Sequence, residues 1–138
     1  MSDELLAAAR QAALAAYAPY SRFRVGAAAR VNGVIHTGCN IENASYGLAI
    51  CAERVAIFRA VAAGGQRLDE LAVACIDAAS DGPPGALMPC GACRQVIAEF
   101  ADADLLIHID RVGSFRLAAL LPSPFRLILQ TQGPTRKL

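Results

Sequence analysis

The sequence lacks an apolar segment long enough to cross a membrane. A transmembrane helix needs about 18 or more consecutive apolar residues, and no run in the 138 residues reaches that length. The chain also lacks the positively charged start of a secretory signal, because Asp3 and Glu4 open it, and Arg10 and Gln11 interrupt the alanine run that follows. This segment predicts an amphipathic helix. We therefore expect no membrane association and a cytoplasmic location.

An excess of either charge is also missing, since 13 basic and 12 acidic residues give a formal net charge of +1. The charges are mixed along the chain, without the one-sided basic stripe that binding to a phosphate backbone requires. We therefore expect a small neutral substrate and no nucleic-acid partner. The length predicts one domain, residues 1–138, able to close its own core. An alanine-rich apolar fraction of 55% favours compact packing and subunit contacts.

The five cysteines cannot form a complete disulfide framework, because their number is odd. In a reducing compartment, clustered cysteines more often bind metal or take part in catalysis. That description fits Cys51, Cys90 and Cys93. Cys39 and Cys75 lie in apolar, strand-like segments, where we expect small buried hydrophobic side chains.

Hydrophobic periodicity and turn residues predict the element order α-β-β-α-β-α-β-β. Asn32-Gly33 is a strong signal for a two-residue hairpin turn, and Gly64-Gly65 ends the second helix. The expected helices cover residues 3–17, 51–63 and 90–100, and the expected strands cover residues 23–31, 34–41, 71–76, 105–109 and a short segment near Phe115. Strands that alternate with helices after a hairpin predict a mixed five-stranded sheet in a three-layer α/β/α sandwich.

The strongest chemical pattern is Cys51-Ala52-Glu53 followed later by Pro89-Cys90-Gly91-Ala92-Cys93. An isolated C-x-x-C is a weak signal, because it is also found in redox dithiols and in halves of zinc ribbons. Here a Gly- and Pro-rich loop precedes the motif, unlike the start of a thioredoxin, and a second C-x-x-C is missing. Three cysteines with a nearby carboxylate match a catalytic zinc site, which keeps a fourth position open.

The geometry of this pattern is feasible only at the starts of two helices. Residues two apart point to different sides of a helix interior, so Cys51 must lie at or before the first turn for Glu53 to share its site. Cys90 and Cys93 are three apart and face the same way. Helix N-termini also favour thiolates, because their unpaired N–H groups and positive dipole ends offset negative charge. Arg54 is a candidate for contact with the ligands, whereas Arg94 fits a solvated or ion-paired arginine nearly as well.

These residues closely resemble the cytidine deaminase family of zinc enzymes, whose motif combines H-x-E or a cysteine version of it with P-C-x-x-C. The resemblance extends over most of the chain, through the segments 20–27, 38–47, 50–54, 89–95 and 120–122. It implies one Zn²⁺ per subunit, bound by Cys51, Cys90 and Cys93, and Glu53 as the group that moves protons. The implied reaction is hydrolytic deamination of cytidine and 2′-deoxycytidine to the uridine nucleoside plus ammonia, in pyrimidine salvage.

The same resemblance implies the residues that contact the nucleoside and a homotetramer with shared active sites. Asn40 and Glu42 are two apart on an expected strand, so their side chains leave one face, and the resemblance assigns them to the ribose 3′-hydroxyl. The other implied contacts are Phe23 against the pyrimidine, the Ala52 amide at the pyrimidine O2, the Cys90 carbonyl at the leaving amine, and Ala44, Tyr46 and Phe125 near a neighbouring subunit's site. Arg126 follows Phe125 where the family more often has a small residue.

Three other functions are compatible with parts of the pattern. A deaminase for an aminopyrimidine antibiotic of the blasticidin type shares the fold, but the Asn40–Glu42 pair favours a ribose. A structural zinc module needs a fourth protein ligand, and neither His36 nor His108 has the spacing of one. The weak basic character and short chain disfavour a deaminase acting on polynucleotides.

Overall fold

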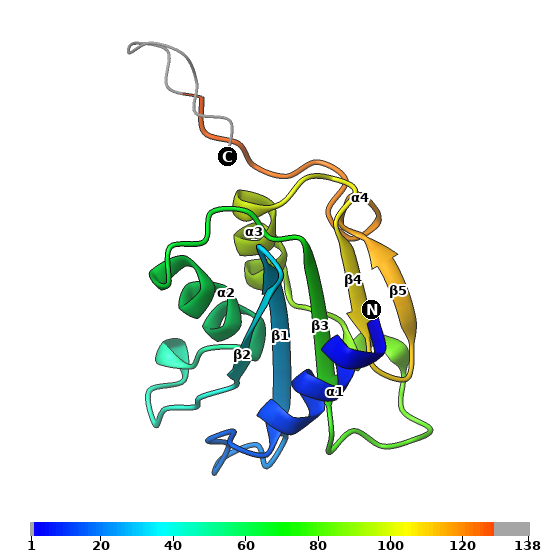
Figure 1. Ribbon diagram of the computed structural model, residues 1–138. Helices are drawn as coiled ribbons and strands as arrows, with labels where there is room; N and C mark the ends of the chain where they lie inside the picture. Colours follow the sequence, from blue (N-terminus) through cyan, green and yellow to red (C-terminus); the bar gives the residue numbers. More distant parts are fainter. Residues whose placement is uncertain (1, 129–138) are drawn as a thin grey trace.

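A mixed sheet of five strands forms the centre of the protein, in the computed structural model that describes residues 2–128 (Figure 1). Its spatial order is β2 (Val34–Cys39), β1 (Val25–Val31), β3 (Glu70–Cys75), β4 (Leu106–Ile109) and β5 (Gly113–Arg116). β1 is antiparallel to both β2 and β3, β3 is parallel to β4, and β4 is antiparallel to β5. The expected mixed sheet is therefore confirmed.

Helices cover both faces of this sheet and complete the expected three layers. On one face, Leu5 and Ala9 of α1 (Ser2–Ala13) pack against small residues of β1 and β3. On the other face, α2 (Ala52–Ala62) and α3 (Gly91–Phe100) enclose the larger core with alternate residues of the same strands. The starts of α2 and α3 lie on this second face, which places the cysteine motifs there.

Two glycines allow the helices to approach the sheet closely. A Cβ atom on Gly26 of β1 would lie 1.9 Å from the carbonyl oxygen of Ala9 in α1. A Cβ atom on Gly38 of β2 would lie 2.4 Å from the backbone nitrogen of Ala56 in α2. Any side chain at either position would therefore push a helix off the sheet. Gly38 in particular fixes how the first turns of α2 lie against β2.

The sequence predicted the hairpin turn, but α1 and β2 both end earlier than predicted, at the opposite end of the hairpin from that turn. Asn32 and Gly33 both have positive φ, 51° and 76°, as a type I′ turn requires. α1 ends at Ala13, four residues early, because Tyr17 leaves the helix and exchanges backbone hydrogen bonds with Asn40 and Glu42. The residues beyond Cys39 pair with that returning segment, so the regular part of β2 stops there.

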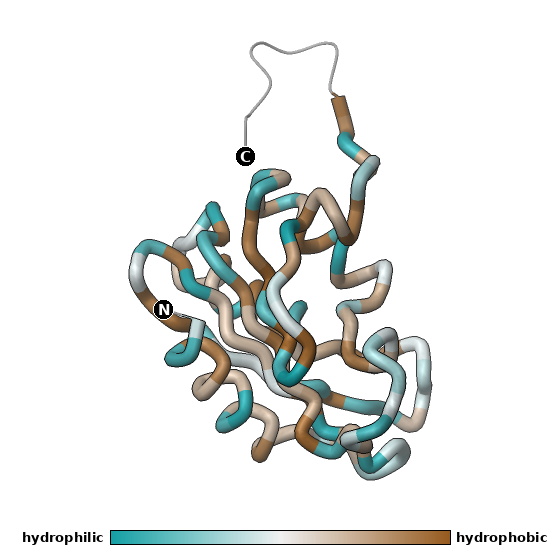
Figure 2. Tube along the Cα trace, turned by 90° about the vertical axis from the view of Figure 1, so that its right-hand side faces the viewer, coloured by the Kyte–Doolittle hydropathy of each residue, from teal (hydrophilic) through white to brown (hydrophobic). Residues whose placement is uncertain are grey.

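Short helices occupy segments to which the sequence pattern assigned neither a helix nor a strand. The amphipathic nature of α1 is visible in the colouring of Figure 2. The short elements are η1 (Tyr46–Leu48), η2 (Pro84–Leu87) and α4 (Leu117–Leu120). Along α1, hydrophilic and hydrophobic residues alternate with the turns of the helix (Figure 2). Among residues 2–128, no helix has both the length and the apolar character to cross a membrane.

Candidate metal centre and substrate pocket

The starts of α2 and α3 bring three thiols together. Cys51 is the N-cap residue of α2, Cys90 is the N-cap residue of α3, and Cys93 lies in the first turn of α3. The Sγ atoms of Cys51 and Cys90 are 3.9 Å apart, those of Cys90 and Cys93 are 3.5 Å apart, and all three lie within 4.8 Å of one another. Cys51 therefore lies at the cap position, where Glu53 can turn toward the same centre.

The spacing of the three sulfur atoms fits a zinc ion. With Zn–S bonds of about 2.3 Å, tetrahedral ligands lie about 3.8 Å apart, close to the observed separations. The group that could hold a metal contains these three residues and no fourth member from the part of the chain that the structure describes. Three ligands leave one tetrahedral position for solvent or substrate. That arrangement is typical of a catalytic zinc site rather than a structural one.

The groups around Cys51 favour its thiolate form. A hydrogen bond from Cys93 and contact with the Arg54 guanidinium lower the pKa of Cys51 to about 5. The same hydrogen bond, together with burial of the Cys93 thiol, raises the pKa of Cys93. The positive ends of α2 and α3 also stabilise negative charge here. Cys51 is thus the thiol of the cluster whose surroundings favour a thiolate in the absence of a cation.

Glu53 is a carboxyl group buried next to the thiols. Its side chain lies in the first turn of α2 with only 5% of its surface exposed, and Oε2 is 3.8 Å from Cys93 Sγ. Burial raises the pKa of this carboxyl to about 7. A carboxyl with such a pKa can accept and release a proton near neutral pH. Its position beside the cluster, but outside the group of three ligands, suits proton transfer.

The two arginines that follow the motifs have different environments. Arg54 Nη2 lies 3.5 Å from Cys51 Sγ, so its positive charge acts directly on the cluster. Arg94 instead donates to two backbone carbonyls, from Nε to Pro89 at 2.8 Å and from Nη1 to Leu120 at 2.7 Å. Arg94 therefore fastens the loop before Cys90 to the end of α4. Its side chain is half-buried and, among residues 2–128, bonds to backbone carbonyls rather than to an acidic side chain.

Asn40 and Glu42 lie just beyond β2 and are held by hydrogen bonds to residues 20–25, the segment that leads into β1. Asn40 accepts from the Val25 amide and donates to the Phe23 carbonyl, both at 2.8 Å. The Glu42 carboxylate accepts from the backbone amides of Tyr20 and Ser21 at 3.0 and 3.1 Å, and from the Ser21 hydroxyl at 2.5 Å. These hydrogen bonds, that of the Ser21 hydroxyl foremost, lower the pKa of Glu42.

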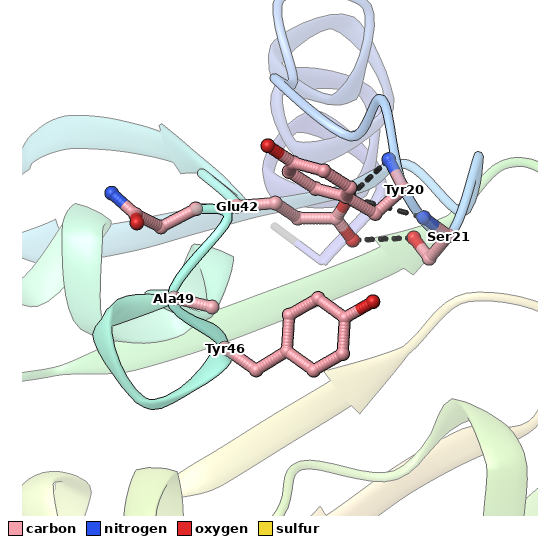
Figure 3. A pocket seen from close by; sticks show the side chains of 6 residues that line it. Tyr20, Ser21, Glu42, Tyr46 and Ala49 are labelled. Atoms are coloured by element: carbon pink, nitrogen blue, oxygen red, sulfur yellow. Dashed lines mark hydrogen bonds between the residues drawn. The ribbon is translucent and has the colours of Figure 1, made fainter.

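Glu42 and Tyr46 border a pocket of about 320 Å³ (Figure 3). The Tyr20 and Tyr46 rings approach edge to face, with centroids 6.1 Å apart. The complete lining consists of Tyr20, Ser21, Glu42, Asn43, Tyr46 and Ala49. In Figure 3 the carboxylate of Glu42 points toward Ser21, while the Tyr46 ring comes from the opposite wall. The pocket combines aromatic surface with one fixed negative charge.

The remaining predicted residues are distributed around these two centres. Ala52 is fully buried in the first turn of α2, and Phe23 is half-buried between Ser21 and Asn40 in the hydrogen-bond network. Ala44 is exposed and lies outside the pocket lining. Phe125 is also outside it, with 71% of its surface exposed, and its carbonyl accepts from Gln95 of α3 at 3.0 Å. Within this chain, the structure does not bring Phe125 to Glu42.

Sequence reasoning missed the role of Ser21. Its hydroxyl links Glu42 to the Phe23 amide, which donates to it at 3.1 Å. A serine whose oxygen accepts from the amide two residues later is a common local turn. The spacing of Ser21 and Phe23 can be read from the sequence. The contact between Ser21 and Glu42 cannot, because these residues are 21 positions apart and lie on different loops.

Neither histidine belongs to the thiol cluster, as the sequence predicted. His36 lies in β2 and His108 in β4. Both ring nitrogens of His108 have partners, with Nδ1 at 2.6 Å from Ser114 Oγ and Nε2 at 2.5 Å from Glu70 Oε2. His108 lies opposite Ala72, a residue that faces α1. It is therefore on the other side of the sheet from the cysteines.

Comparison with known proteins agrees with this geometry. The family described as the cytidine and deoxycytidylate deaminase zinc-binding region matches residues 1–109, which include all three cysteines and Glu53 and end before Phe125. The chain belongs to this family, so the resemblance seen in the sequence is confirmed.

Relatives and solved structures match over most of their length. A cytidine deaminase of Mycobacterium tuberculosis (strain H37Rv) is 52% identical over 120 residues, which cover 86% of this chain and 85% of the relative. One from Sporosarcina psychrophila is 42% identical over 128 residues, which cover 89% and 90%. The crystal structure of a Burkholderia pseudomallei cytidine deaminase superimposes with a TM-score of 0.80 at 42% identity, covering 91% of this chain and 99% of that one.

Proposed function

We propose that this protein catalyses the zinc-dependent hydrolytic deamination of cytidine and 2′-deoxycytidine, which yields the uridine nucleoside and ammonia. The observation that carries this proposal is the buried Glu53 carboxyl beside a cluster of three thiols that has no fourth ligand among the described residues. The names of the relatives support the same reaction. The set of three ligands disfavours a structural zinc module.

In the proposed mechanism Cys51, Cys90 and Cys93 hold Zn²⁺, and Glu53 moves the protons. When bound, Zn²⁺ lowers the pKa of a water molecule from about 15.7 to roughly 7. Glu53 takes a proton from the attacking water and delivers it to N3 of the pyrimidine, which makes C4 more electrophilic. The water oxygen forms a bond to C4. Glu53 then carries the remaining proton of that oxygen to the amino group, the C4–N bond breaks, ammonia leaves, and the C4 carbonyl of the product forms.

Backbone groups at the two helix starts can orient the pyrimidine. We assign the Ala52 amide to the pyrimidine O2, because the first amides of a helix have no partner within it. The Cys90 carbonyl accepts from the Arg94 amide at 3.0 Å and keeps a second lone pair for the leaving amine. Phe23 packs against the ring in this arrangement. The Arg54 guanidinium offsets the negative charge of the thiolates.

Asn40 and Glu42 are assigned to the ribose 3′-hydroxyl. A carboxylate accepts the hydroxyl proton, and an amide N–H donates to the hydroxyl oxygen. Both side chains are held by hydrogen bonds to residues 20–25, which reduces the entropy lost when a ligand binds. A blasticidin-type substrate would not need this pair, so a panel of cytidine, cytosine and blasticidin separates the two functions.

The assembly we propose is a homotetramer in which a neighbouring subunit helps to complete each site. Large apolar side chains are exposed near the pocket, with Tyr46 at 78% and Leu48 at 66%. Ala44 is exposed on the same loop, and Phe125 extends from the segment beside α3. Exposed apolar surface of this kind is typical of interaction sites.

A cytoplasmic location belongs to the same proposal. All five cysteines are free thiols, and a reducing compartment keeps such thiols available for metal.

The decisive experiment compares wild type with Glu53→Gln. The amide keeps the shape of the side chain but cannot transfer the proton, so kcat should fall by about 10² or more, while zinc stays stoichiometric. Loss of cytidine absorbance gives the rate, and elemental analysis gives the metal content. Glu99→Gln, at an exposed position of α3, is the matched control and should leave kcat unchanged. Near-normal turnover by Glu53→Gln would refute the assignment, and a zinc-loaded wild type inactive on cytidine would refute the function.

A further inference from the structure

The carboxylate of Glu42 has an unusually complete set of hydrogen-bond donors for a group near the surface. Its Oε1 atom accepts from two backbone amides, those of Tyr20 and Ser21. Its Oε2 atom accepts from the Ser21 hydroxyl. The three dashed lines of Figure 3 all come from these two neighbouring residues. A carboxylate offers about four acceptor positions, so the described part of the chain leaves one position on Oε2 for a ligand.

The hydrogen of the Ser21 hydroxyl has only one direction available. Its oxygen accepts from the Phe23 amide at 3.1 Å, and the single O–H then points to Glu42 Oε2. Rotation of the hydroxyl would break one of these contacts. Ser21 therefore decides which lone pair of Oε2 stays open. Without its hydroxyl, the carboxylate keeps only the two bonds to Oε1, and Oε2 gains a second open position.

The same network continues to Asn40. The Phe23 carbonyl accepts from Asn40 Nδ2, and Asn40 Oδ1 accepts from the Val25 amide. An NH₂ group has two donors, and the second N–H of the Asn40 amide has no partner among residues 2–128. Glu42 thus keeps one acceptor position and Asn40 one donor, which together match one hydroxyl group. Ser21 and Phe23 connect the two side chains.

We propose that Ser21 is a positioning residue for the sugar hydroxyl of the substrate, because its own hydroxyl fixes the Glu42 carboxylate in the orientation that receives the ligand. Ser21 acts through Glu42 and does not contact the reacting atoms. This inference rests on the proposed function. It extends that function by naming a residue outside the pair assigned to the ribose. If Ser21 had a purely structural role in the loop, its removal would instead weaken the binding of every substrate equally.

The test compares Ser21→Ala and Ser21→Thr on cytidine and on 3′-deoxycytidine, which lacks the hydroxyl in question. Where turnover of the deoxy analogue is slow, its inhibition constant replaces KM. Loss of a hydrogen bond to a charged group should raise the KM of Ser21→Ala for cytidine about tenfold, with kcat within about twofold. The constant for 3′-deoxycytidine should change by less than about twofold. Ser21→Thr keeps the hydroxyl and should stay within about threefold of wild type.

Two controls separate positioning from general damage. Ser80→Ala removes a serine from the exposed loop after β3 and should leave all constants unchanged. In a Glu42→Ala background, adding Ser21→Ala should change the KM for cytidine by less than about twofold, because the group through which Ser21 acts is gone.

Equal losses on both nucleosides, a fall in kcat at constant KM, or an unchanged KM in Ser21→Ala would overturn the positioning role. So would a full additional loss in the Glu42→Ala background. Each of these outcomes is read against a wild type that deaminates cytidine. Failure of the proposed function itself would appear differently, as a zinc-loaded wild type without deaminase activity.

Discussion

The metal centre and the pocket beside Glu42 are built in different ways. The three thiols and Glu53 lie on the first turns of two helices that pack against the sheet. Glu42 and Asn40 lie on irregular chain beyond β2 and are held by hydrogen bonds to a second loop. Packing of the core fixes the geometry of the metal centre, whereas a few polar contacts hold Glu42 and Asn40 in place. Reactive groups whose positions must be held to within about an ångström are better carried by rigid elements such as packed helices.

The difference in construction implies a difference in how each region fails. A displaced helix start would need disruption of the packing around Gly38, where the backbone of α2 lies against β2. Loss of one loop hydrogen bond changes a carboxylate orientation without moving the core. Changes at the thiols should therefore be nearly all-or-none, and changes at the pocket should be graded.

The largest effect is expected for Cys90→Ala. The remaining pair of thiols is too few to hold zinc in a three-ligand site, so metal and activity should both be lost. Because Cys90 is exposed, the fold of the metal-free chain should change little. Elemental analysis and the cytidine absorbance assay measure the two losses. Cys75→Ala, on β3, should keep its zinc. A Cys90→Ala protein with stoichiometric metal would exclude Cys90 as a ligand and remove the contrast between the regions.

An intermediate effect is expected for Phe125→Ala, which probes whether the pocket is incomplete within one chain. If the ring reaches a neighbouring site, its loss should raise the KM for cytidine about two- to tenfold, the range of an aromatic contact, at unchanged zinc content. Leu127→Ala, equally exposed on the same segment, should have no effect on KM. Sedimentation should give the mass of four chains for the wild type. A fully active monomer would contradict the shared site.

The parts of the molecule that the sequence could predict are those set by local rules. The cap position of Cys51 follows from the need for Glu53 to face the same centre, because residues two apart point to different sides within a helix. Cys90 and Cys93 are three apart and face the same way on their helix. The hairpin turn follows from Asn32-Gly33. The mixed sheet in three layers follows from a hairpin followed by strands that alternate with helices; the spatial order of its strands was not predicted.

What the sequence could not predict depends on contacts between distant segments. α1 ends at Ala13 because Tyr17 pairs with residues beyond β2. No residue next to Ala13 is of a type that ends helices, so the sequence did not indicate this end. Likewise, Ser21 meets Glu42 only after two loops have come together. Arg94 looks like any surface arginine in the sequence, yet its two acceptors are backbone carbonyls, at Pro89 and Leu120. Such roles require the fold itself.

The smallest effect is expected for Arg126→Ala, at the residue that follows Phe125. Arg126 Nη1 donates to the Ala98 carbonyl at 2.8 Å, and the carbonyls of the last helical turn lack partners within α3. The positive charge also suits a helix C-terminus, an interaction of about 0.3–1 kcal/mol at the surface. Arg126 thus attaches the segment of Phe125 to the helix whose other end carries Cys90 and Cys93.

The alanine variant should lower the melting temperature by about 1–4 °C and leave zinc content and kcat unchanged. Thermal unfolding with elemental analysis measures this. Arg116→Ala is the matched control, because its partner Asp104 is even more exposed than Arg116 itself, and such a surface pair contributes little. Equal melting temperatures for the two variants would mean that Arg126 does not cap α3. Loss of zinc in Arg126→Ala would be more informative still, because it would show that the two ends of α3 are coupled and that the metal centre also depends on a polar surface contact.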